Sequence, residues 1–109
     1  MPDNLSVLLK GYREAIVQIF GNQLSRVVLY GSYARGDFKQ DSDMDIMILA
    51  DVLPEEISRY ADKVYDVTYD FEMQYGMEIN PSVQSIQTYE QWKNVSPFFM
   101  NIEKDGVAV

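Results

Sequence analysis

The chain has 109 residues, enough for one domain with one hydrophobic core, and we expect that domain to span residues 1–109. Apolar residues make up 47% and charged residues 24%, the balance of an ordinary globular protein. The sequence contains no cysteine and no histidine. These two absences exclude disulfides, thiolate or imidazole metal sites, cysteine nucleophiles and Ser-His-Asp triads. Chemistry in this chain therefore depends on carboxylates, hydroxyls, amines, guanidinium groups and backbone amides.

The charge balance is strongly acidic, with 17 acidic against 9 basic residues and a formal net charge of −8. Non-specific binding of nucleic acid needs a positive surface, so direct nucleic-acid binding is not expected. An acidic chain attracts divalent cations or a basic protein partner instead, although solubility alone also explains the charge. The N-terminus lacks the pattern of a signal peptide, and no stretch approaches the roughly 20 apolar residues of a membrane span. We therefore expect a cytoplasmic protein.

The first half of the chain predicts one helix and two strands. Apolar residues spaced three and four apart over residues 5–20 predict an amphipathic helix that ends at Gly21. Residues 26–30 are β-branched and apolar, which predicts a buried strand. Residues 33–42 are polar and predict a helical turn followed by an exposed loop, and residues 44–50 predict the second strand.

The second half predicts helices around one further strand. An apolar stripe over residues 54–75 begins with proline and acidic residues, which are typical of a helix start, and ends at Gly76. Residues 77–80 predict a short strand that Pro81 closes and that resumes through Val83. Two short helices follow, at 88–95 and 97–103. This order of elements predicts an α/β layer architecture with a small sheet.

The candidate chemistry lies between the first two predicted strands. Gly31 and Ser32 stand where the first strand ends, and exposed backbone N–H groups at such a turn hold an anion. Glycine lets a phosphate approach closely, and the serine hydroxyl adds a hydrogen bond. Asp43 and Asp45 lead into the second strand and project to one side, so they repel unless a cation lies between them. Without histidine or cysteine, the natural cation is Mg²⁺, which binds carboxylates together with substrate phosphates.

A phosphate-binding turn, paired acids and a metal together indicate phosphoryl or nucleotidyl transfer. Each part alone has an ordinary explanation, because a Gly-Ser pair is usually a turn and an Asp-x-Asp pair is usually a solvated loop edge. The combination is harder to explain in this way, since carboxylates at the start of a buried strand are unfavourable without a partner.

The segment GSYARGDFKQDSDMDIMIL, with Gly31-Ser32, ten residues and then Asp43-x-Asp45, resembles the signature of the polymerase-β-like nucleotidyltransferase superfamily. Length and layout are similar to its minimal members, the MNT proteins. The resemblance implies an α/β (α+β) fold with a small mixed β-sheet flanked by helices, and it places ATP and two Mg²⁺ ions at the sheet edge. Gly31 and Ser32 would hold the triphosphate, and Asp43 and Asp45 the metals. The resemblance also implies an antitoxin that transfers AMP from ATP to a tyrosine of a HEPN-type toxin.

Two further site residues have competing interpretations. The resemblance places a third carboxylate on the next strand, where Glu78 is the acidic residue, and the alternative is a surface glutamate on a short edge strand. Arg35 reaches a phosphate in one interpretation and pairs with Asp37 or Asp41 in the other.

Three hypotheses for function follow. The first is a metal-dependent nucleotidyltransferase that uses ATP. Its catalytic and metal-binding residues are Asp43, Asp45 and Glu78, and its nucleotide-binding residues are Gly31, Ser32 and Arg35. The second is a catalytically silent module that neutralises a partner by contact, and the third transfers the nucleotide to a small hydroxylated molecule. The third has less support, because related enzymes of that kind add an acceptor-binding domain. The sequence leaves open whether the chain forms a homo-oligomer and which nucleotide base it prefers.

Overall fold

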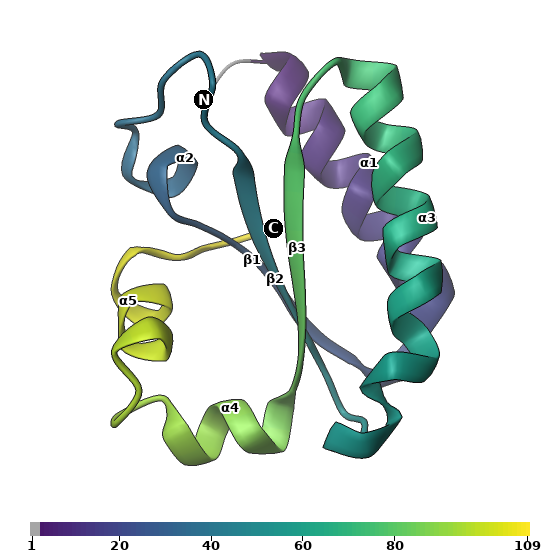
Figure 1. The fold of residues 1–109 in the computed structure, drawn as a ribbon, viewed down its shortest axis with the longest axis vertical. Helices are drawn as coiled ribbons and strands as arrows, with labels where there is room; N and C mark the ends of the chain where they lie inside the picture. Colours follow the sequence, from purple (N-terminus) through teal and green to yellow (C-terminus); the bar gives the residue numbers. More distant parts are fainter. Residues whose placement is uncertain (1–2) are drawn as a thin grey trace.

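The computed structural model describes residues 3–109 and forms a four-stranded sheet with helices on both faces (Figure 1). In chain order the elements are α1 (Asp3–Phe20), β1 (Leu24–Tyr30), α2 (Ser32–Arg35), β2 (Met44–Ala50), α3 (Ile57–Tyr75), β3 (Ile79–Ser85), α4 (Ile86–Trp92), α5 (Pro97–Asp105) and β4 (Val107–Ala108). Short 3₁₀ turns precede β1 and α3, at Gly21–Gln23 and Pro54–Glu56. The expected α/β (α+β) fold is confirmed. Among the described residues, no helix is long and apolar enough to cross a membrane.

The strand order β3-β2-β1-β4 makes the sheet mixed, as the resemblance implied. β2 and β3 are parallel, whereas β1 is antiparallel to both β2 and β4. The register places Tyr30 of β1 opposite Asp45 of β2, and Asn80 of β3 beside Asp45 on the other flank. A carboxylate near the start of β2 therefore has a fixed neighbour on each side.

Alternation along the strands divides the apolar residues between two cores. On one face, Leu29, Ile46 and Ile48 pack with the apolar sides of α1 and α3, which lie side by side in Figure 1. On the other face, Val28 and Met47 pack with residues of α4 and α5. Tyr30 follows Leu29 and Asp45 precedes Ile46, so the side chains of Tyr30 and Asp45 lie on the opposite face, with α4 and α5.

The third strand differs from the prediction. Pro81 does not close it, because β3 runs without interruption from Ile79 to Ser85 as the edge strand next to β2. The Glu78 carbonyl accepts the Met44 N–H at 2.9 Å, so the backbone groups of Glu78 point toward β2. By alternation, the backbone groups of Ile79 and Pro81 point away from β2, toward the open edge of the sheet. Proline is tolerated at such a position because no ladder hydrogen bond is lost.

Other donors on the outer edge of β3 are occupied by side chains. The Ile79 N–H donates to the Glu72 carboxylate at 2.8 Å, and the Ser85 N–H donates to Gln84 Oε1 at 3.2 Å. Pro81, between these two residues, has no N–H group. Val83 therefore carries the one remaining N–H group of β3 that points outward. The edge therefore offers few free donors.

Other elements also differ from the prediction. Glu78 lies just before β3 rather than inside it, and α4 occupies Ile86–Trp92 rather than residues 88–95. The sequence analysis also missed β4, which consists of Val107–Ala108 and pairs with β1. Two residues carry too short a pattern to be recognised without the strand against which they lie.

Candidate active site

The turn between β1 and α2 has a backbone conformation that depends on glycine. Gly31 has φ of 75° and ψ of −153°, a region that essentially only glycine occupies. Its carbonyl accepts the N–H groups of Ala34 and Arg35, both at 3.1 Å, and so begins the helical turn. The N–H groups of Ser32 and Tyr33 belong to the first turn of α2, where helical geometry supplies no acceptor. These donors are suitably placed for phosphate oxygens.

Gly31 also brings this turn against one of the candidate carboxylates. A Cβ atom at Gly31 would collide with Asp45 Oδ2, so only a residue without a side chain allows this approach. The two motifs that the sequence separates by ten residues, at Ser32 and Asp43, therefore meet in space. The predicted grouping of the glycine-serine turn with the acid pair rests on this contact.

The other oxygen of Asp45 has a partner that the sequence analysis missed. Asn80 Nδ2 donates to Asp45 Oδ1 at 3.1 Å from the neighbouring strand β3. This bond orients the carboxylate and adds an amide oxygen to the polar groups of the site. The sequence signal for Asn80 was its position two residues after Glu78, which places both side chains on one side of an extended segment. Only the register of β2 and β3 reveals that Asn80 lies beside Asp45.

Glu78 lies beside Asp43 rather than beside Asp45. A hydrogen bond with Asp43, and then the negative charge of Asp43, raise the pKa of the Glu78 carboxyl above its ordinary value. Both side chains are exposed, and the hydrogen bond from the Met44 N–H to the Glu78 carbonyl sets their strands in this register. The structure therefore brings the third predicted acid to the site, although it is not part of the strand that was predicted to hold it.

Tyr30 is a second residue of the site that the sequence analysis passed over. Burial raises the pKa of Tyr30 most, and the negative charge of Asp45 raises it further, whereas a hydrogen bond with Ser82 lowers it. The ring packs edge-on against Phe98 of α5, with 5.6 Å between the ring centroids. Its position directly before Gly31 was the available signal.

The loop after α2 is held by its own polar groups. Arg35 Nε lies 3.2 Å from Asp37 Oδ2, which is one of the two arrangements expected for this arginine. An exposed ion pair of this kind contributes about 1 kcal/mol or less, so Arg35 remains able to turn toward a phosphate. Ser42 Oγ accepts the Lys39 N–H at 2.8 Å. Beside this loop lies a polar cleft of about 230 Å³, lined by Tyr33, Gln40, Asp41, Ser42, Gly76, Met77 and Glu78.

The donor set determines what kind of metal site is feasible. Among residues 3–109, no three Asp, Glu, His or Cys side chains are close enough together to hold an ion by themselves. The acids occur instead as the Asp43–Glu78 pair and as Asp45 with its amide partner. Mg²⁺ commonly takes one or two carboxylates and completes its shell with water and substrate phosphates. The residues present fit Mg²⁺ that binds together with a nucleotide.

Comparison with known proteins identifies the class. The family model described as a nucleotidyltransferase domain matches residues 9–103. The chain therefore belongs to the nucleotidyltransferase domain family and is a nucleotidyltransferase, as its sequence motif implied. A relative from Methanocaldococcus jannaschii, named "Putative protein adenylyltransferase MJ0604", is 32% identical over 98 residues, which cover 90% of this chain and 90% of the relative.

Solved structures share the fold. A toxin–antitoxin structure named MntA-HpeT is 14% identical with a TM-score of 0.55, and covers 89% of this chain and 70% of that one. A toxin–antitoxin structure determined with AMP-PNP is 16% identical with a TM-score of 0.53, and covers 87% and 69% respectively. At these identities the likeness shows a shared fold.

Proposed function

We propose that this nucleotidyltransferase uses ATP and Mg²⁺ to transfer AMP to a tyrosine hydroxyl of a HEPN-type toxin, and so acts as an antitoxin in the cytoplasm. The observation that carries the proposal is the contact of Asp45 with Gly31, which joins the acid pair to the phosphate-binding turn. The name of the relative MJ0604 supports adenylyl transfer to a protein. The fold shared with toxin–antitoxin structures, one of them with AMP-PNP, supports the type of partner and nucleotide.

Each residue has a role that follows from its position. The N–H groups of the first turn of α2, with the Ser32 hydroxyl, hold the β- and γ-phosphates, and Arg35 adds a cation at the rim. Asp43 and Asp45 hold the metal site, where Mg²⁺ would neutralise phosphate charge and favour ionisation of the acceptor hydroxyl. Glu78 lies beside Asp43 and orients that hydroxyl. The tyrosine oxygen attacks the α-phosphorus, pyrophosphate leaves, and the hydroxyl proton passes to a carboxylate or to water.

The charge of the chain fits the proposed partner. A net charge of −8 favours association with a basic protein surface such as that of a ribonuclease. The same charge disfavours binding of this chain to nucleic acid. Neutralisation is therefore expected to act on the toxin itself.

The first experiment tests the metal and nucleotide site. Calorimetry should show that Mg²⁺ strengthens ATP binding to the wild type, and that Asp43→Asn/Asp45→Asn loses this gain, with affinity falling by about tenfold or more. Asp62→Asn/Asp66→Asn is the matched control, because it removes two exposed acids from α3 and leaves the site intact. Equal, metal-independent ATP affinity in all three proteins contradicts the assignment.

The second experiment separates an enzyme from a silent binding module. With α-labelled ATP and a co-expressed HEPN-type toxin, wild type should label a toxin tyrosine. Glu78→Gln should keep ATP affinity within a few-fold and slow labelling by about 100-fold or more, because it removes an interaction used in the transition state. The binding module is the correct interpretation if the toxin carries no label and Asp43→Asn/Asp45→Asn still neutralises it at wild-type strength.

A further inference from the structure

An apolar cavity lies on the opposite side of the sheet from the candidate active site. It has a volume of about 290 Å³ and lies between α1 and the edge formed by β4. Its lining residues are Ser6, Leu9, Lys10, Arg13, Leu29, Val107, Ala108 and Val109. Leu29 and Tyr30 point to opposite faces of β1, so the sheet separates this cavity from Asp45. The site is therefore distinct from the one already described.

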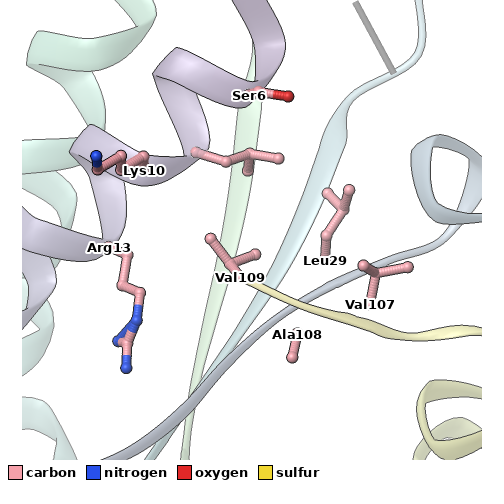
Figure 2. A pocket seen from close by; sticks show the side chains of 8 residues that line it. Ser6, Lys10, Arg13, Leu29, Val107, Ala108 and Val109 are labelled. Carbon is pink, nitrogen blue, oxygen red and sulfur yellow. The ribbon is translucent and has the colours of Figure 1, made fainter.

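The lining combines aliphatic side chains with positive charge. In Figure 2, Leu29 and Val107 lie on one side, Arg13 lies on the other, and Val109 is between them. The side chain of Lys10 turns away from Val109 in the same view, so its charge acts from the rim. None of the side chains that line the cavity is acidic, although the chain has 17 acidic residues.

Arg13 carries an unfulfilled hydrogen-bonding group. Its Nη1 atom is buried and has no hydrogen-bond partner among the described residues. A buried guanidinium nitrogen without an acceptor is unfavourable, and such groups are rare in native structures. Because Nη1 has almost no accessible surface, the guanidinium must turn toward the cavity for this atom to meet an acceptor there. An anionic oxygen is the acceptor that a guanidinium binds most strongly, in a paired geometry when the anion is a carboxylate.

We infer that this cavity binds an amphipathic anion, with an aliphatic chain between α1 and β4 and a carboxylate on Arg13. The volume is near the lower limit of about 300 Å³ for small-molecule sites, which suits one short-chain ligand. The aliphatic lining favours the chain, and a guanidinium in a cavity lined by no acidic side chain favours the negative head group. A second copy of this acidic chain is the less suitable occupant, because association would bring two chains of net charge −8 together.

The test uses three probes that share one aliphatic chain and differ in charge. Octanoate, 1-octanol and octylammonium are titrated into the full ¹⁵N-labelled chain and followed by amide chemical shifts. Octanoate should bind saturably at one site and shift the amides of Leu9, Lys10, Ala108 and Val109. Octanol should bind at least about tenfold more weakly, and octylammonium should not bind at this site.

Variants then identify the charge responsible. Arg13→Met keeps an apolar stem and should weaken octanoate binding by about tenfold or more, to the level of octanol. Arg13→Lys restores a cation and should recover part of the affinity, which keeps the test decisive even if Arg13→Met folds poorly. Arg59→Met removes the same charge from an exposed position on α3 and should leave the affinity within about twofold.

Three outcomes overturn the inference. The first is the absence of saturable octanoate binding to the wild type, and the second is equal affinity of wild type and Arg13→Met for octanoate. The third is a concentration-dependent dimer of the wild type that Arg13→Met abolishes, because the occupant of the cavity is then a second copy. ATP binding measured in parallel is expected to be the same in both proteins.

Discussion

Replacing Gly31 by alanine tests the contact on which the site depends. The substitution adds one methyl group, which has two consequences in this structure. The backbone at φ of 75° and ψ of −153° is unfavourable for any residue with a Cβ atom, and that atom would collide with Asp45 Oδ2. The first effect lowers stability, and the second displaces a carboxylate of the site.

Gly36 provides a matched control within the same loop. It has φ of 84° and ψ of 8°, so alanine there also occupies a left-handed conformation, but nothing lies within 4 Å of the added Cβ atom. Gly36→Ala should therefore reduce the free energy of unfolding by about 1–2 kcal/mol. Gly31→Ala should reduce it by about 3 kcal/mol, because its backbone region is less accessible and the carboxylate must move.

Urea unfolding and nucleotide transfer measure the two consequences separately. A loss of about 3 kcal/mol lowers the urea midpoint by about 1–3 M, and a domain with about 5–15 kcal/mol of stability stays folded. In the folded protein, a carboxylate displaced by about 1 Å should slow AMP transfer by about 100-fold in Gly31→Ala only. If both variants lose equal stability and bind Mg²⁺ and ATP equally well, Gly31 does not position Asp45 and the proposed site is wrong.

Two further predictions concern a buried tyrosine and the phosphate-binding turn. Burial raises the pKa of Tyr12 to about 12 from 10.0, so the free energy of unfolding is unaffected by ionisation of this group below pH of about 10 and falls as the pH rises toward 12. This decline amounts to about 3 kcal/mol. Urea unfolding of Tyr12→Phe should lack the decline and should lose only about 1 kcal/mol near neutral pH, because Thr68 still bonds to the Val64 carbonyl at 2.7 Å. Ser32→Ala should weaken ATP binding by about tenfold in calorimetry, with little change in stability. Ser25 is exposed on β1, so Ser25→Ala should leave both ATP binding and stability unchanged. If Ser32→Ala binds ATP as the wild type does, the phosphates bind elsewhere.

Local patterns were sufficient for the parts of the fold that carry their own signals. The helix predicted over residues 5–20 and the strand at 44–50 follow from apolar spacing that burial in the structure confirms. The Gly31-Ser32 turn and the Asp43-x-Asp45 pair were identifiable because glycine, a hydroxyl and paired acids stand at strand ends. Each of these signals lies within a few residues of the feature that it predicts.

The remaining features depend on pairing between distant segments. Asn80 could not be assigned to Asp45 from the sequence, because the two residues are 35 positions apart and meet only through the parallel register of β2 and β3. Pro81 was misinterpreted because proline ends a central strand but fits the outward position of an edge strand, and the sequence does not state which strand is at the edge. The cavity at Arg13 was unpredictable for the same reason, since it requires β4 to lie beside α1.

The outer edge of β3 limits how this protein can aggregate. An exposed strand edge is normally a template on which another chain adds by backbone hydrogen bonding, and such addition leads to domain swapping or fibrils. Here Pro81 offers no donor, and the donors at Ile79 and Ser85 are already engaged by side chains. An incoming strand would find too few backbone donors to extend the sheet on this side. The chain is thereby protected from self-templated growth along this edge of the sheet.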